Sequence, residues 1–268
     1  DGATGMTMWS YPTGDQVYRK CLKSTDLTGD GAVDVIVGSD VGTLFALNGP
    51  DGDTLWTSPL GGQCTDVKLL QMNDTGPLDV IASVGSYNAP AQIVVLNGED
   101  GTLLWGYDSG NSVEHCAPLD ANNDGIIDVA GAVSGSRVFA VDGSTNLTLW
   151  DVPIESAGNT QSIDAGPLND DKYEDVVVPG NSTDRVVWAL SGEDGSVLWS
   201  HPVGGEVNCV LIYDVDNDLQ NEVVAGSDDQ IVYVIDGSSG DLEWSFSTAD
   251  DVMDVGVGDI SNDGLPNI

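Results

Sequence analysis

Six tryptophans recur at nearly constant spacing, and this repeat restricts the fold more than any other feature of the chain. They lie 45 to 49 residues apart, at Trp9, Trp56, Trp105, Trp150, Trp199 and Trp244. A period of roughly 20 to 50 residues is the signature of solenoids, propellers and other repeat arrays. Regular repeat positions serve a shared core, so we expect these tryptophans to be core residues.

Two phrases recur at this period. One ends at the tryptophan, as in LNGPDGDTLW (47–56) and LSGEDGSVLW (190–199), and DGATGMTMW (1–9) is a weaker copy. The other is acidic, as in DLTGDGAVDVIVGS (26–39) and DANNDGIIDVAGA (120–132). Around them lie short segments rich in Val and Ile and bounded by Gly, Asp, Asn and Ser, which is strand chemistry with turn residues between. Each repeat therefore offers four strands.

Four antiparallel strands in each repeat predict an all-β chain, a β-propeller with one domain over residues 1–268. We expect six blades. Five lie at about 10–56, 57–105, 106–150, 151–199 and 200–244, and the sixth is a partial blade at 245–268 that the strand 1–9 closes. Ile268 aligns with Val35 and Asp1 with Asn48, so the last blade lacks the equivalents of 36–47. Seven or eight blades follow if the sequence is a fragment, and a neighbouring chain is another source of the missing strand.

The two phrases resemble the repeats of two propeller families. The glycine-rich phrase that ends in tryptophan, as in GSSGDLEW (237–244), is similar to the repeat of PQQ-like propellers. The acidic phrase resembles the FG-GAP repeat of integrin-α-type propellers, with its calcium loop. The resemblance covers essentially the whole chain and implies the propeller fold and calcium as the bound ion. It implies little about function, because both repeats occur in enzymes, adhesins and scaffold proteins.

Each acidic phrase places oxygen-bearing side chains at alternate positions around a tight turn, which suits a hard cation that takes six to eight oxygen ligands. We expect calcium sites in the loops at 26–34, 120–128 and 214–222, with further candidates at 167–175 and 259–267. The loop at 71–79 carries little charge and is expected not to bind. The candidate ligands are Asp26, Thr28, Asp30, Ala32 (carbonyl), Asp34, Asp120, Asn122, Asp124, Ile126 (carbonyl), Asp128, Asp214, Asp216, Asp218, Gln220 (carbonyl), Glu222, Asn169, Asp171, Asp175, Asp259, Ser261 and Asp263.

The charge of the chain excludes several classes of partner. It has 7 Lys and Arg against 44 Asp and Glu, a formal net charge of −37. Nucleic-acid binding needs a basic surface, and anionic membranes repel such a chain. Calcium modules of low affinity work outside cells, so we expect an extracellular or cell-surface location and a structural role for the ions.

The cysteines and the glycosylation sequons also favour an extracellular location. The four cysteines, Cys21, Cys64, Cys116 and Cys209, form no C-x-x-C pair, so a zinc site is not expected. We expect disulfides, with Cys21–Cys64 a candidate pair and the connectivity open. Sequons at Asn73, Asn146 and Asn181 fall in predicted loops and are candidate glycan sites.

No catalytic constellation stands out. His115 precedes Cys116, but a nucleophile there would need an orienting group that the sequence does not reveal. The preferred interpretation is a non-catalytic, calcium-stabilised binding, adhesion or structural module of a cell-surface protein or assembly, with a protein or carbohydrate ligand. One alternative is a propeller enzyme, either polysaccharide-degrading or a quinoprotein-like oxidoreductase. Another is a filament- or sheath-forming subunit that associates through blade edges.

Overall fold

The computed structural model of the chain describes residues 3–72, 76–85, 92–133, 137–154, 162–180 and 183–268. Its contacts divide the chain into two compact units, Asp1–Cys116 and Ala117–Ile268. In the described residues the only helical element is a short 3-10 turn, η1 (Arg19–Cys21). The predicted all-β class is confirmed.

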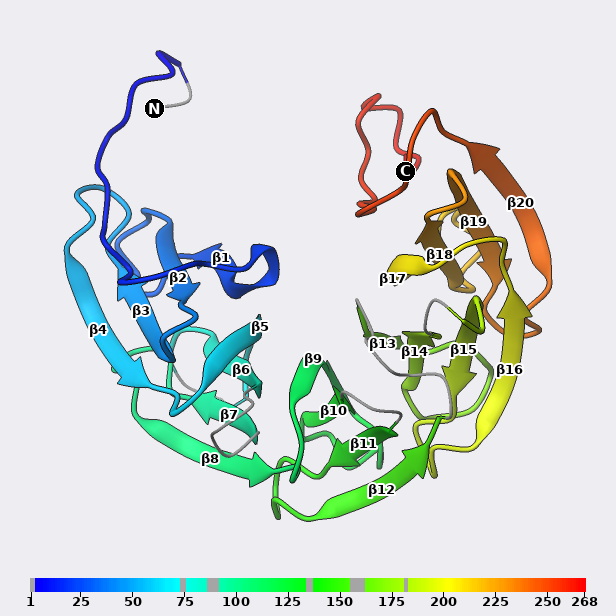
Figure 1. Cartoon of the computed structure of the whole chain (residues 1–268), viewed down its shortest axis with the longest axis horizontal. Helices are drawn as coiled ribbons and strands as arrows, with labels where there is room; N and C mark the ends of the chain where they lie inside the picture. The colour runs from blue at the N-terminus through cyan, green and yellow to red at the C-terminus, as the bar shows by residue number, and fades with distance from the viewer. Residues whose placement is uncertain (1–2, 73–75, 86–91, 134–136, 155–161, 181–182) are drawn as a thin grey trace. The chain divides into compact units, whose positions relative to one another are not determined.

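Five four-stranded antiparallel sheets follow one another along the chain, and in each the strands pair in sequence order (Figure 1). The first unit holds β1 (Leu22–Thr25), β2 (Asp34–Gly38), β3 (Thr43–Leu47) and β4 (Thr54–Pro59), then β5 (Gln63–Leu70), β6 (Asp79–Gly85), β7 (Gln92–Leu96) and β8 (Leu103–Asp108). The third sheet has β9 (Val113–Leu119), which spans the boundary, and β10 (Asp128–Val133), β11 (Arg137–Val141) and β12 (Thr148–Pro153).

The second unit continues with two further sheets of the same kind. The first is β13 (Asp164–Gly166), β14 (Asp175–Pro179), β15 (Val186–Leu190) and β16 (Val197–Pro202). The second is β17 (Val207–Tyr213), β18 (Glu222–Ser227), β19 (Ile231–Asp236) and β20 (Leu242–Ser247). Residues after β20 form no further named strand, and one isolated bridge pairs Gly258 with Asn267.

The second strand of each sheet is the centre of the core. Every residue of β6, β10, β14 and β18 is buried, as in strands that are covered on both faces. In the first unit, Ile36 of β2 and Val80 of β6 belong to one apolar cluster that joins two sheets. In the second unit, Val177 of β14 and Val223 of β18 do the same. Neighbouring sheets of one unit therefore bury their faces against each other, as expected for repeats that cannot bury their faces alone.

A contact that we call the tryptophan dock fastens one repeat to the next inside each unit. The indole Nε1 of Trp56 donates to the Gly98 carbonyl at 2.9 Å, and that of Trp150 donates to Gly192 at 2.7 Å. Trp9 and Trp199 make the same bond, to Gly49 at 2.6 Å and Gly237 at 2.7 Å. The dock therefore joins residues about one repeat apart.

The second glycine of the docked turn has to be glycine for two reasons. Gly52, Gly101, Gly195 and Gly240 have φ between +71° and +76°, a region that side chains disfavour. A Cβ at any of them would lie 2.6 to 2.8 Å from an atom of the docked ring. The repeated Gly-x-x-Gly pattern is thus the sequence signature of a backbone surface on which an indole lies flat.

Candidate metal sites

Five of the acidic loops connect the first and second strands of a sheet, and the sixth, at 259–267, follows β20. Four of the six share one backbone conformation. Positions are counted from the first residue of each loop, so that position 1 is Asp26 in the loop at 26–34. The fourth position has a left-handed φ, between +56° and +74°, at Gly29, Asn123, Asn217 and Asn262. The sixth position is also left-handed, at Gly31, Gly125, Leu219 and Gly264, between +75° and +85°. Leu219 adopts this left-handed φ although the conformation normally selects glycine. A residue with a side chain pays an energetic cost there, so Leu219 marks a constrained turn.

Backbone N–H groups hold the first carboxylate of each loop in the same way. The N–H of Gly31 donates to Asp26 Oδ2 at 2.9 Å, and that of Gly125 donates to Asp120 Oδ2 at 3.0 Å. The corresponding bond runs from Leu219 to Asp214 at 3.0 Å, and from Gly264 to Asp259 at 2.9 Å. The pKa of the Asp26 carboxyl lies below its usual value, and the hydrogen bond from the Gly31 N–H is the largest cause of this lowering. The four loops therefore hold this carboxylate in one direction, and in the first loop the backbone donors also favour its ionised form.

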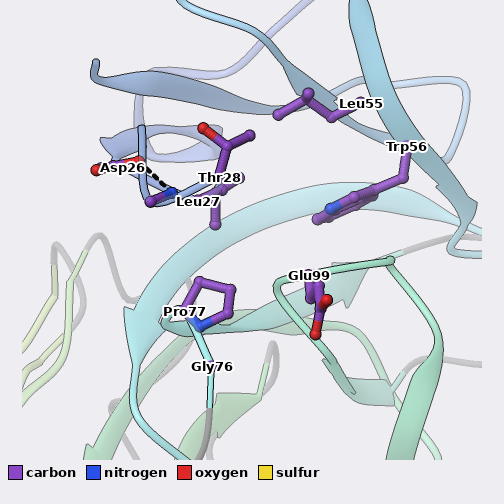
Figure 2. Close-up of a pocket in the computed structure, with 9 residues that line it drawn as sticks. Asp26, Leu27, Thr28, Leu55, Trp56, Gly76, Pro77 and Glu99 are labelled. Carbon is purple, nitrogen blue, oxygen red and sulfur yellow. Dashed lines mark hydrogen bonds between the residues drawn. The ribbon is translucent and has the colours of Figure 1, made fainter. Parts of the chain in front are cut away.

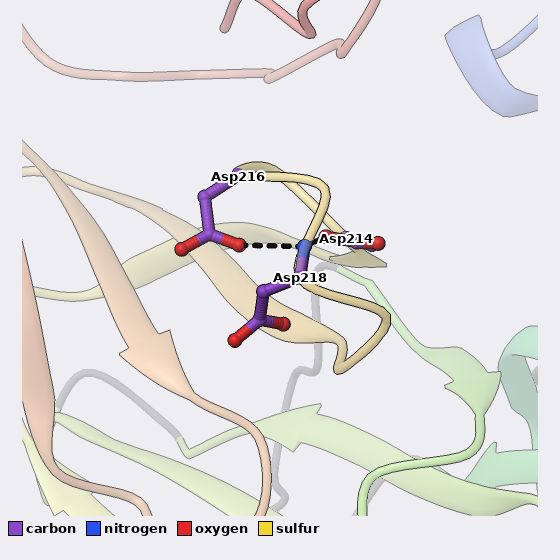
Figure 3. A group of neighbouring side chains, drawn as sticks. All are labelled: Asp214, Asp216 and Asp218. Atoms are coloured by element: carbon purple, nitrogen blue, oxygen red, sulfur yellow. Dashed lines mark hydrogen bonds between the residues drawn. The ribbon is translucent and has the colours of Figure 1, made fainter.

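The carboxylates converge most closely in the loop at 214–222. Each of Asp214, Asp216 and Asp218 offers an oxygen within 4.8 Å of the other two, and in the described part of the chain no other group of three acidic, His or Cys side chains does so (Figure 3). The N–H of Asp218 donates to Asp214 Oδ1 and Asp216 Oδ1, both at 3.1 Å. Three carboxylates this close repel one another in water, and a divalent cation removes that repulsion.

The remaining loops differ in their charge. The loops at 26–34 and 120–128 have carboxylates at positions 1 and 5, with Thr28 or Asn122 between them. In the loop at 259–267 Ser261 takes that place. The loop at 167–175 begins with Pro167 and lacks the left-handed pair, so it has no first carboxylate for the backbone to hold. Its Asn169 and Asp171 accept N–H bonds from Asp171 and Tyr173, as the third and fifth positions of the loop at 120–128 do from Asp124 and Ile126. The structure thus groups 259–267 with the three strongest sequence candidates by backbone, and separates 167–175 from them.

The ninth position has a role that the sequence did not reveal. Asp34 is fully buried, its Oδ2 accepts from Leu27 at 3.0 Å, and its Oδ1 accepts from Gly49 at 3.0 Å. Asp128, Asp175 and Asp79 form the equivalent pair of bonds. Because Asp79 does so in the loop expected not to bind calcium, this carboxylate ties the acidic loop to the glycine turn whether or not the loop binds metal.

Burial of these ninth-position groups shifts their protonation. Desolvation raises the pKa of Asp128 and Asp175 to about 6, and that of Glu222 to about 7. Backbone donors oppose the rise in pKa in each case but do not cancel it. In the loops at 120–128 and 214–222 a first carboxylate held by backbone N–H groups therefore accompanies a buried ninth carboxyl group whose charge is costly.

A pocket of about 670 Å³ adjoins the first of these loops (Figure 2). Its wall combines apolar and acidic side chains and contains no basic one. A carboxylate-bearing cofactor such as a quinone would need basic partners, which this lining does not supply. The lining residues are Asp26, Leu27, Thr28, Gly29, Leu55, Trp56, Gly76, Pro77 and Glu99.

All four cysteines lie in the described part of the chain, and each is a buried thiol outside any disulfide, in contrast to the predicted disulfides. Cys21 and Cys64 do lie together, but the Cys21 thiol donates to the Cys64 carbonyl at 3.1 Å. The contact with the Cys21 thiol, with burial, raises the pKa of Cys64 well above its usual value. Burial inside a packed sheet preserves a thiol without a covalent link, which is the physical reason for the difference. Cys209 is buried in the last complete sheet.

His115 has the buried carboxylate neighbour that the sequence could not identify. Its Nδ1 lies 3.5 Å from Asp66 Oδ2, and Lys68 Nζ lies 3.9 Å from the same oxygen. Burial favours a neutral Asp66, but the contact with His115 and the charge of Lys68 bring the pKa of Asp66 below its usual value. The adjacent Cys116 has its pKa raised to about 12 by burial, so it carries no thiolate at neutral pH. The group is a buried polar cluster and not an activated nucleophile.

Of the sequons, Asn146 lies in the exposed turn between β11 and β12, with φ of +60°. Asn73 and Asn181 lie outside the described residues. Where the structure describes the chain, no helix is long and apolar enough to cross a membrane.

Repeating four-stranded sheets joined by tryptophan docks define a β-propeller repeat protein. The family described as outer membrane protein assembly factor BamB matches residues 1–181 and 91–262, and the chain belongs to this family. No curated protein matches the sequence significantly. The PQQ-like resemblance is thereby confirmed, and the FG-GAP calcium type stays a prediction.

Solved structures with low sequence identity share the fold. A complex of BBS1N with ARL6DN has a TM-score of 0.63 at 12% identity, covering 92% of this chain and 87% of that one. Saccharomyces cerevisiae Sqt1 has a TM-score of 0.68 at 13% identity, covering 87% and 63%. The V. cholerae biofilm matrix protein Bap1 has a TM-score of 0.60 at 18% identity, covering 85% and 39%. At these identities the likeness establishes the fold alone.

Proposed function

We propose that the protein is an extracellular, calcium-stabilised β-propeller module that presents a binding surface within a cell-surface protein or assembly. The observation that carries the proposal is the convergence of Asp214, Asp216 and Asp218 in a loop whose backbone recurs in three other loops. Four copies of one loop geometry, in a chain of net charge −37, favour divalent cations as a working part of the fold.

The ions act on stability in this account. A site with a dissociation constant of about 10⁻⁴ M, at roughly twenty times that concentration of calcium, stabilises the folded state by about 2 kcal/mol. Three such sites contribute about 5 kcal/mol if they act independently, which raises the melting temperature by roughly 10 °C or more for a chain of this size. Calcium at that concentration is present outside cells, which supports the proposed location.

A protein partner is the favoured ligand class. Propellers of similar fold include BBS1N, whose structure was solved in complex with ARL6DN. The exposed sequon at Asn146 is consistent with the extracellular location, and peptide mass mapping of protein from its native source tests it: an unmodified Asn146 in every molecule would count against that location.

The calcium proposal is tested by calorimetric melting of metal-free protein with and without about 2 mM calcium. We expect a rise in melting temperature that falls by about a third in Asp216→Asn/Asp218→Asn. The matched control is Asp250→Asn/Asp251→Asn, which removes the same charge from an exposed turn outside the loops and should respond like the wild type. An unchanged melting temperature in the wild type would refute the proposal.

A further inference from the structure

The pocket beside the loop at 26–34 lies between the first two repeats, inside the first unit (Figure 2). All of its lining residues are among those that the structure describes. Thr28 and Trp56 line it from the first repeat, and Pro77 and Glu99 line it from the second. Glu99 is exposed, and its carboxylate accepts no hydrogen bond from the described residues. The pocket therefore has an unused acceptor in its wall.

The same junction recurs between the third and fourth sheets, and there a side chain crosses it. Tyr173 has the place of Pro77, at the seventh position of an acidic loop. Glu193 has the place of Glu99, in the glycine turn on which a tryptophan docks. The Tyr173 hydroxyl donates to Glu193 Oε1 at 3.0 Å, and Lys172 Nζ lies 4.6 Å from the centre of the Tyr173 ring, a cation–π contact. In the second unit a phenol with an ammonium group over it therefore spans from the loop to the turn.

A further bond closes the junction of the second unit and has no counterpart in the first. Glu174 Oε2 accepts from the Asp120 N–H at 2.8 Å, which ties two neighbouring acidic loops together. Leu78 has the place of Glu174 in the first unit and offers no acceptor in its side chain. The segment GPL (76–78) thus lacks the ammonium, the phenol and the carboxylate that KYE (172–174) supplies. The pocket of about 670 Å³ adjoins the place where these groups are missing.

We infer that this pocket binds a partner protein through a tyrosine side chain that has a lysine next to it. The partner then supplies to the first unit the groups that Lys172 and Tyr173 supply to the second. The phenol hydroxyl donates to the Glu99 carboxylate, and the ring lies against the apolar part of the wall, which includes Leu55 and Pro77. The volume is within the range of about 300 to 1,000 Å³ that ligand pockets have, so it admits a tyrosine with its neighbours. The inference rests on the proposed function as a binding module and names the chemistry of its partner.

The charge of the site favours a basic residue beside the tyrosine. Asp26 and Glu99 are the charged residues of the lining, and both are acidic. The net charge of −37 attracts cationic segments of a partner and repels acidic ones. A phosphate on the partner's tyrosine would bring about two negative charges against Glu99. The pocket should therefore bind tyrosine and reject phosphotyrosine.

NMR of the indole N–H groups of the full chain reports on the site directly, because Trp56 lines the pocket and Trp150 is its counterpart at the filled junction. The probe is the capped peptide Gly-Ser-Lys-Tyr-Ser-Gly, and Trp56→Phe and Trp150→Phe assign the two resonances. We expect the Trp56 resonance to shift with a dissociation constant of about 1 mM or lower, while the Trp150 resonance stays in place. The same peptide with phenylalanine or phosphotyrosine in place of tyrosine should bind about fivefold or more weakly.

Exchanging the two segments provides the decisive arm. Gly76→Lys/Pro77→Tyr gives the first unit the residues of the second, so it should close the pocket and abolish the shift of the Trp56 resonance. Lys172→Gly/Tyr173→Pro opens the second junction, so the peptide should then shift the Trp150 resonance as well. Circular dichroism confirms that each variant folds.

A matched pair of substitutions tests the acceptor. Glu99→Gln should weaken binding of the peptide about fivefold or more, because the hydroxyl loses a charged acceptor. Glu193→Gln makes the same exchange at the turn that Tyr173 already occupies, and it should bind the peptide like the wild type.

The titration is made in a chelator and again with about 2 mM calcium, so that it is separate from the calcium proposal. A Trp56 resonance that stays in place in both conditions would overturn the inference. Equal binding of the phenylalanine peptide, wild-type binding by Gly76→Lys/Pro77→Tyr, or an unmoved Trp150 resonance in Lys172→Gly/Tyr173→Pro would overturn it too. A chain that calcium stabilises but that binds no peptide contradicts this inference alone. A chain that binds the peptide without any response to calcium contradicts only the calcium part of the proposed function.

Discussion

Replacing Trp150 by phenylalanine isolates the hydrogen bond of a tryptophan dock from its bulk. The indole Nε1 of Trp150 donates to the Gly192 carbonyl at 2.7 Å, and the residue is 6% exposed. A phenylalanine ring would fill most of the same space, but the carbonyl of Gly192, which is itself buried, would lose its donor.

The magnitude follows from two terms. A buried carbonyl without a partner costs about 1 to 3 kcal/mol. The smaller ring also gives up roughly 40 Å² of buried apolar surface, which at about 25 cal/mol per Å² is close to 1 kcal/mol. We therefore expect Trp150→Phe to lower the free energy of unfolding by about 3 kcal/mol.

Urea unfolding followed by far-UV circular dichroism measures this loss without relying on tryptophan emission. The matched control is Trp244→Phe, the same exchange at an exposed ring with no hydrogen bond in the described structure. It should change the unfolding free energy by less than about 0.5 kcal/mol. Equal effects of the two substitutions would show that the dock does not stabilise the fold, and the repeat packing described above would have to be reconsidered.

Three further predictions follow from the same structure. Burial raises the pKa of Asp128, Asp175 and Glu222, so protonation of these groups stabilises the folded state fully below about pH 4, and this stabilisation is lost as pH rises through about 6 to 7. Metal-free protein should therefore have a higher melting temperature at pH 5 than at pH 8. A melting temperature that is unchanged or higher at pH 8 would refute this prediction. The four buried thiols should be inert to a thiol reagent in native protein and should all react in urea; fewer than four reactive thiols in urea without reductant would indicate a disulfide. Gly101→Ala places a Cβ 2.6 Å from the Trp56 ring and should destabilise more than Gly110→Ala, which has nearly the same left-handed φ but open space; similar melting temperatures would contradict the dock geometry.

The sequence predicts much of the fold because the same pattern of strands and turns recurs in five consecutive repeats. Tryptophan spacing predicts four strands in each repeat, and the Val- and Ile-rich composition predicts strands at 34–38, 43–47, 92–96 and 230–235. The first three are strands with those bounds, and the fourth is one residue later, as β19 (Ile231–Asp236). The number of blades and the closure of the last one stay predictions, since they depend on residues far apart in the chain.

The candidate sites are less visible in the sequence. Alternate Asp, Asn and Thr residues indicate the loops, but the role of Asp34 depends on the N–H of Gly49, fifteen residues away and on another turn. Asp66 and His115 meet across two sheets, and no local pattern pairs them. Trp244 looks like every other repeat tryptophan in the sequence, and only the structure shows that its ring is exposed.

Native mass spectrometry of metal-free protein titrated with calcium tests calcium binding by the acidic loops most directly. We predict three ions per chain at millimolar calcium, from the loops at 26–34, 120–128 and 214–222, and a fourth ion, in the loop at 259–267, only at higher calcium. Asp216→Asn/Asp218→Asn should bind one ion fewer, and Asp250→Asn/Asp251→Asn should bind the full number. A chain that binds no calcium, or a loop variant that binds as many ions as the wild type, would contradict the account.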